Sequence, residues 1–114
     1  MTYREINNLI KTLAGLLEVP SSYYQFEEET SPPFLTFNYP DSDDFYADDV
    51  NYQRKTRLDI YYCSDFRDLS GAEQQIETFL KLNEMPYTKE ATYIESEKMW
   101  ETIYSTEVLL DEQS

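Results

Sequence analysis

The chain has 114 residues, the length of a single domain, and one α+β domain spanning 1–114 with one hydrophobic core is expected. Aromatic residues make up 16% of the chain and glycines number only two, which favours strands packed through aromatic pairs over a disordered chain. The net charge of −14 disfavours a protein that wraps nucleic acid, because phosphate contacts need clustered lysine and arginine.

The start of the chain carries the signals of a helix. Thr2 and Glu5 form a T-x-x-E capping box, and Pro20 prevents a helix from continuing much further. Between them, apolar residues recur on one helical face at Ile6, Leu9, Ile10, Leu13 and Leu17. The pattern predicts a first helix over about Tyr3–Leu17.

Two strands are expected next. In residues 21–30, Tyr24 and Phe26 alternate with their neighbours before three glutamates, which predicts a short strand followed by a solvated turn. A pair of prolines then forces an extended entry into residues 34–39, a β-rich run that Pro40 ends. This run predicts the second strand.

The longest strand is expected over Val50–Cys63, and the rest of the chain is organised around it. Residues of one parity are mostly apolar, namely Val50, Tyr52, Thr56, Leu58, Ile60 and Tyr62. Arg54 is the exception on this parity, so the first part of the strand is expected to stand away from the core. An acidic segment with five aspartates, residues 41–49, leads into the strand.

A second helix and a final pair of strands complete the chain. Ser70 and Glu73 match a second capping box, and an apolar stripe follows at Ala72, Ile76, Phe79 and Leu80. Strands are expected over Tyr87–Ile94 and Met99–Leu110, joined by a short turn. The order α-β-β-β-α-β-β predicts an α+β fold, with a mainly antiparallel sheet and both helices packed on one of its faces.

The residue types give little support for an enzyme. The chain has no histidine, so a serine or cysteine nucleophile would lack its usual base and zinc its commonest nitrogen ligand. The aspartate-rich segment 41–49 has no glycine, whereas a calcium loop of the EF-hand type needs one. Cys63 cannot form an internal disulfide and is expected to be a small buried or edge residue. No catalytic residue, metal or other cofactor is therefore expected.

The distribution of charge identifies a candidate contact surface. Residues 41–49 carry five acids and no base, whereas residues 50–67 carry four bases and two acids, the one basic region of the chain. An exposed acidic loop with aromatic residues suits protein contact, and three cations in so acidic a chain are weak evidence for nucleic-acid binding. The candidate interface residues are Asp44, Phe45, Tyr46, Asp48, Asp49, Arg54, Lys55 and Arg57.

Two segments resemble a known family. Asp44-Phe-Tyr-Ala-Asp-Asp49, before the long strand, and Tyr93-Ile-Glu-Ser-Glu-Lys-Met99, before the last one, are similar to tail-completion or tail-terminator proteins of long-tailed bacteriophages and prophages. The resemblance implies a structural protein of the virion tail that assembles in the host cytoplasm. It implies a homo-oligomeric ring, expected to be a hexamer, that caps the tail tube, docks the head-tail connector protein and lets DNA pass without specific binding.

Two other functions fit the same sequence. A DNA-mimic inhibitor of a DNA-binding enzyme would also be small, acidic and without catalytic residues. A head-side connector or stopper protein would differ only in binding the head side of the head-tail junction instead of the tail side.

The sequence shows no signal for a membrane. No apolar run approaches the ~20 residues that span a bilayer, and the first residues lack the layout of a signal peptide, so no membrane partner is expected.

Overall fold

The computed structural model describes residues 2–40 and 54–110 of the chain. Within these residues the elements follow the predicted order α-β-β-β-α-β-β, which confirms the α+β fold. The elements are α1 (Tyr3–Leu17), β1 (Ser21–Tyr23), β2 (Phe34–Asn38), β3 (Arg54–Ser64), α2 (Ala72–Leu82), β4 (Tyr87–Ile94) and β5 (Met99–Leu110).

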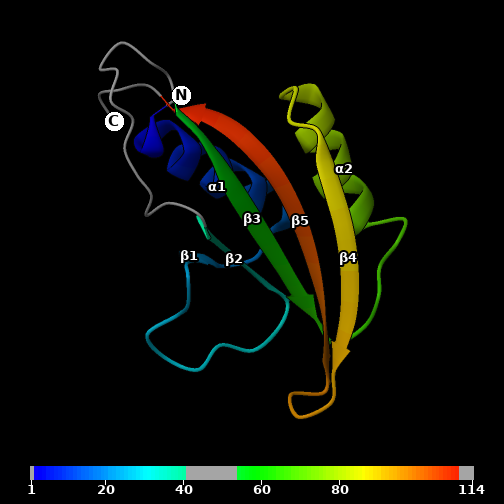
Figure 1. The fold of residues 1–114 in the computed structure, drawn as a ribbon. Coiled ribbons are helices and arrows are strands. Elements are labelled where there is room, and N and C mark those ends of the chain that lie inside the picture. The colour runs from blue at the N-terminus through cyan, green and yellow to red at the C-terminus, as the bar shows by residue number, and fades with distance from the viewer. Residues whose placement is uncertain (1, 41–53, 111–114) are drawn as a thin grey trace.

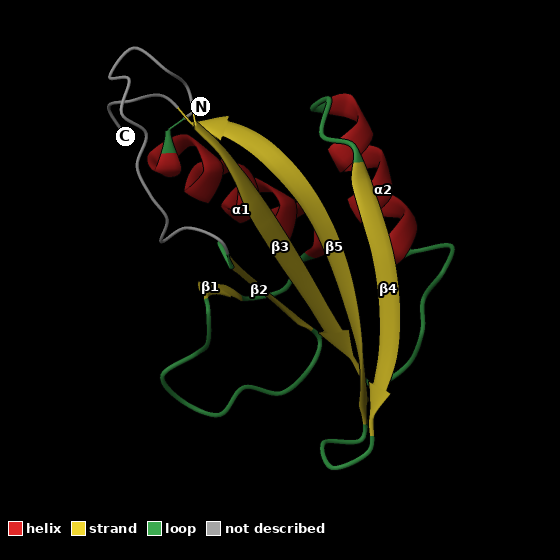
Figure 2. Ribbon diagram, in the orientation of Figure 1, coloured by secondary structure: helices red, strands yellow, loops and turns green. Residues whose placement is uncertain are grey.

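The strands of the described residues form one sheet in the order β1-β2-β3-β5-β4 (Figure 1). The short β1 runs parallel to β2, and every other neighbouring pair is antiparallel. Strands β3 and β5 pair along their length, from Arg54 opposite Leu110 to Ser64 opposite Trp100. Figure 2 shows α1 and α2 on the same side of this sheet, so one face is covered by helices and the other is left open by them.

Helix α1 has the bounds that its sequence predicts, and the capping box is formed. The Thr2 hydroxyl accepts a hydrogen bond from the Glu5 N–H at 3.1 Å, and the Glu5 carboxylate accepts one from the Thr2 N–H at 2.9 Å. These bonds satisfy two of the N–H groups that a helix start leaves without partners. At the other end Glu18 adopts a left-handed conformation, with φ of 59°, and closes the helix before Pro20.

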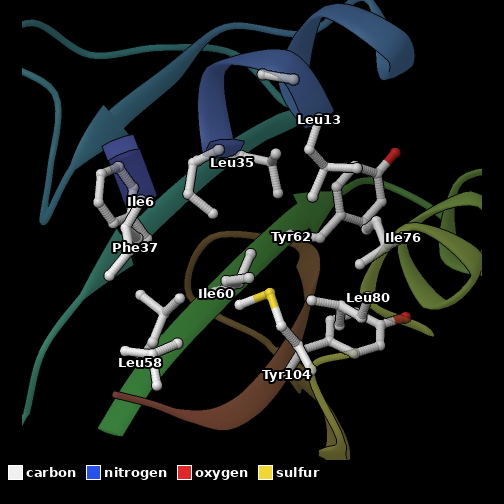
Figure 3. Close-up of a cluster of buried hydrophobic side chains, with 14 of the residues drawn as sticks. Ile6, Leu13, Leu35, Phe37, Leu58, Ile60, Tyr62, Ile76, Leu80 and Tyr104 are labelled. Atoms are coloured by element: carbon white, nitrogen blue, oxygen red, sulfur yellow. The ribbon is translucent and has the colours of Figure 1, made fainter. Parts of the chain in front are cut away.

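The core lies between the helices and the covered face of the sheet (Figure 3). Leu58 and Ile60 of β3 are fully buried there, as the predicted alternation requires. Each such side chain contributes about 1.5–3 kcal/mol relative to an exposed position. Their neighbours in the cluster include Ile6, Leu13, Leu35, Phe37, Tyr62, Ile76, Leu80 and Tyr104.

The second predicted capping box is wrong. Helix α2 begins at Ala72, with Gly71 in the capping position and no side-chain cap on Gly71 itself. The carboxylate of Asp68 instead accepts a hydrogen bond from the Ala72 N–H at 3.1 Å. A Cβ on Gly71 would collide with that carboxylate, so the glycine leaves room for this substitute cap. Glu73 is consequently not part of a cap and turns into the protein.

The first strand is shorter than the aromatic alternation suggests. The chain leaves β1 at Tyr24, which has a φ of 68°, a conformation that ends the regular pairing with β2. Phe26 packs edge-on against Phe34 of β2, with ring centroids 5.3 Å apart. The long strand is described from Arg54 onward, so the expected start at Val50 lies outside the described residues.

Candidate functional site on the open face of the sheet

The candidate site lies on the face of the sheet opposite the helices. Side chains alternate along a strand, so the residues between the core positions of β3 point to this open face. In β3 they are Lys55, Arg57, Asp59, Tyr61 and Cys63. Opposite them in β5 are Leu109, Glu107, Ser105, Ile103 and Glu101.

Of the three cations that the sequence places at the interface, the side chains of Lys55 and Arg57 are described, and Lys55 is the more exposed of these two. Its Nζ lies 3.8 Å from a carboxylate oxygen of Glu107 on β5, and each side chain is 67% exposed. An exposed pair at this distance contributes little to stability, because solvent screens it and holding two long side chains costs entropy. Lys55 is therefore able to form a contact with another molecule at small cost to the fold.

Arg57 has a closer partner within its own strand. Its Nε and one terminal nitrogen donate to the two oxygens of the Asp59 carboxylate, at 3.0 and 3.1 Å. Asp59 is only 3% exposed, so the guanidinium compensates a buried negative charge. Replacing Arg57 would consequently perturb the fold as well as any contact made by its exposed part.

The remaining predicted interface residues cannot be placed in the same way. Arg54 begins β3, but its side chain lies outside the described part of the structure. Asp44, Phe45, Tyr46, Asp48 and Asp49 also lie outside the described residues. Of the predicted site, the structure thus brings together Lys55 and Arg57, two residues apart on one face of β3.

A second charged cluster, which the sequence analysis missed, lies on the covered face. Glu73 of α2 is 1% exposed and receives two hydrogen bonds from Arg67, at 2.8 and 3.0 Å. Lys89 of β4 lies 2.8 Å from Glu73 and 2.6 Å from Glu77, and the Tyr104 hydroxyl donates to Glu77 at 3.1 Å. The two carboxylates are thus matched by two cations, which is the condition for charged groups to be buried.

The electrostatics of this cluster follow from its hydrogen bonds. Those from Arg67 lower the pKa of Glu73, against the opposing effect of burial, and Lys89 lowers it further. The guanidinium of Arg67 also lies over the ring of Trp100, 5.3 Å from its centroid. Because every one of these groups is engaged within the chain, we interpret the cluster as structural.

A sequence signal for this cluster did exist. Glu73 stands three residues before Ile76 and seven before Leu80, so it lies on the buried stripe of α2. A glutamate on such a stripe needs a buried cation, whereas a capping glutamate would not. The match of Ser70 and Glu73 to a capping box instead led to the prediction that Glu73 is an exposed capping residue.

The described residues contain no group of three or more histidine, cysteine, aspartate or glutamate side chains placed to hold a metal ion. In the same part of the chain, no helix is long and apolar enough to cross a membrane. The fold and surface define an α+β domain with one face of its sheet left open by the helices. No protein-family model and no curated protein matches this sequence.

Proposed function

We propose that this protein is a structural, non-enzymatic component of a long-tailed bacteriophage or prophage, of the tail-completion or tail-terminator type. In this role it forms a ring of six subunits that caps the tail tube and joins it to the head-tail connector. The observation that carries the proposal is the exposed cationic end of β3, with Lys55 and Arg57 on the open face, directly after the acidic segment 41–49.

These two regions suit a head-to-tail contact between identical subunits. In a closed ring each subunit uses two different surfaces, one for each neighbour. Asp48 and Asp49 of one subunit would face Lys55 and Arg57 of the next, and such complementary charges set the register of an interface. The net charge of −14 supports a lumen through which DNA passes without binding, since phosphates are repelled.

Lys55→Glu is the variant that tests the ring contact. We expect it to weaken each subunit contact by about fivefold, or ~1 kcal/mol, because it places a carboxylate against the aspartates of the neighbour. Light scattering at low and moderate salt measures the effect, with a wild-type ring near six times 13.6 kDa. Negative-stain images with tail tubes would then show whether the ring sits at the tube end.

Two controls make this test specific. Lys11→Glu causes the same charge change on an exposed position of α1, on the other side of the sheet, and should leave the oligomer unchanged. Combining Lys55→Glu with Asp48→Lys should restore assembly. Equal effects of the Lys55 and Lys11 variants would contradict the proposed contact. A wild-type protein that is monomeric at every salt concentration, and that forms no ring when tail tubes are added, would favour the DNA-mimic alternative.

A further inference from the structure

A groove of about 730 Å³ lies on the open face, at the opposite end of the sheet from Lys55. Lys55 and Cys63 are eight residues apart on β3, which is about 26 Å along an extended strand. The floor of the groove is formed by β2, β3 and β5, where Phe34, Cys63 and Glu101 lie side by side on adjacent strands. One wall is formed by residues 24–32.

The wall is held against the sheet by contacts that the structure describes. The edge-on pair of Phe26 and Phe34 joins the wall to the floor. The Tyr24 N–H donates to the Phe37 carbonyl at 2.7 Å, and the Ser22 hydroxyl donates to the Gln25 carbonyl at 2.8 Å. This part of the wall, residues 24–26, is therefore fixed on the sheet by the fold.

The groove is acidic. Glu28 and Glu29 line it from the wall, Glu97 from the turn between β4 and β5, and Glu101 from the floor. None of the described residues that line it is basic. Burial raises the pKa of the Glu101 carboxyl, and no ion pair of Glu101 is found among the described residues. A bound cation would stabilise the ionised form of that carboxyl.

An independent observation comes from Thr36 on the floor. Its side chain points to the open face and lines the groove, and the residue is only 8% exposed. No described group forms a hydrogen bond with its hydroxyl. The Oγ1 atom of Thr36 is itself not fully enclosed, so it is reached from the groove and can form a hydrogen bond with a polar ligand there.

From this geometry we propose that the groove binds an arginine- or lysine-bearing segment of a partner protein. Carboxylates pair with the cationic ends, while Phe26, Phe34 and Met99 contact the aliphatic stems, and a guanidinium can also stack on an aromatic ring. A second copy of this chain is a less suitable occupant, because it carries only nine basic residues against 23 acidic ones and would be repelled by the acidic groove. The inference does not rest on the proposed ring.

Fluorescence anisotropy with the full chain tests this site. The probe is a labelled eight-residue peptide with arginine at alternate positions, compared with the same peptide carrying neutral citrulline. We expect the arginine peptide to bind, and Glu28→Gln with Glu101→Gln to weaken it by about fivefold or more, because two carboxylates that pair with it are lost. Amide chemical shifts of the wild-type protein should change in residues 24–36 and 97–101.

The matched control is Glu84→Gln with Glu90→Gln, which removes the same charge at exposed positions outside the groove. Its effect should remain below about twofold, since long-range attraction is screened by salt. Equal weakening by the two double variants would overturn the proposal and indicate attraction to net charge alone. Equal binding of the citrulline peptide, or tighter binding of spermine, would also overturn it. Far-UV circular dichroism would verify that each variant is folded.

Discussion

The two faces of the sheet carry charge in different ways. On the covered face Glu73 is almost inaccessible, and Arg67 and Lys89 both contact it at 2.8 Å. On the open face Arg57 also pairs with buried Asp59, but Lys55 and Glu107 beside them are 3.8 Å apart and mostly exposed. Charges that are matched within the chain stabilise it, whereas weakly matched charges at an open surface are available to a partner. The comparison thus separates groups that maintain the fold from groups that suit binding.

Replacing Glu73 should produce the largest effect on stability. Glu73→Ala leaves Arg67 and Lys89 without their shared carboxylate and removes a buried side chain, so we expect a loss of about 3 kcal/mol. Glu107→Ala on the open face should cost less than about 1 kcal/mol. Urea denaturation of both variants measures the difference, and similar losses for the two would remove the distinction between the faces.

The two faces should also differ in the sign of their pH dependence. Burial raises the pKa of Glu101 in the folded state, so ionisation at neutral pH destabilises the protein, and Glu101→Gln should stabilise it slightly at neutral pH. That gain should shrink as the pH falls below the pKa of the folded protein and disappear below the unfolded-state value of 4.5, where the carboxyl is neutral in both states. Thermal unfolding between pH 3.5 and about 7.5 measures this dependence.

Glu73 provides the opposite case for the same experiment. Its folded-state pKa lies below the usual value of 4.5, so its contribution to stability is present above that value and is lost as the pH falls through the lowered pKa. The stability of wild type relative to Glu73→Gln should therefore decrease in acid. A parallel pH dependence for the Glu73 and Glu101 variants would contradict the assignment of their environments.

The smallest expected effect concerns Cys63. Burial raises the pKa of its thiol to about 12, and the residue is 3% exposed although it lies on the floor of the groove. Because the thiolate is the reactive form, iodoacetamide at about pH 8 should modify Cys63 slowly in the folded protein and rapidly in urea. Mass spectrometry measures both rates. Fast labelling of the folded protein would contradict the burial of Cys63 on the groove floor.

Local patterns predicted much of the fold because their causes are local. The capping box at Thr2 and the alternation around Leu58 and Ile60 each depend on residues close in sequence, and the structure has both. The capping-box pattern gave a wrong prediction at Ser70. There Glu73 forms an ion pair with Lys89, sixteen residues further along the chain. A four-residue motif has no information about which cation the folded sheet places opposite a helix.

The candidate site was predictable only in part, for the same reason. Strand alternation predicts that Lys55, Arg57 and Asp59 share one face, but the burial of Asp59 depends on β2 and β5 pairing on either side of β3. The groove near Glu101 joins segments far apart in sequence, and the pairing of Phe34 with Cys63 and of Cys63 with Glu101 brings them together. Such juxtapositions require the strand order, which no local pattern contains.

The position of Lys89 has a further consequence for how the protein behaves at high concentration. Strand β4 is an edge of the described sheet, and the backbone groups of an edge strand can pair with a strand of another molecule. Lys89 lies near the middle of β4, on the covered face, and is held there by Glu73 and Glu77. An added strand would have to bury part of this ion cluster against its own side chains, which is unfavourable. We therefore expect the lysine that stabilises the helix side of the domain also to disfavour strand addition at this edge of the sheet.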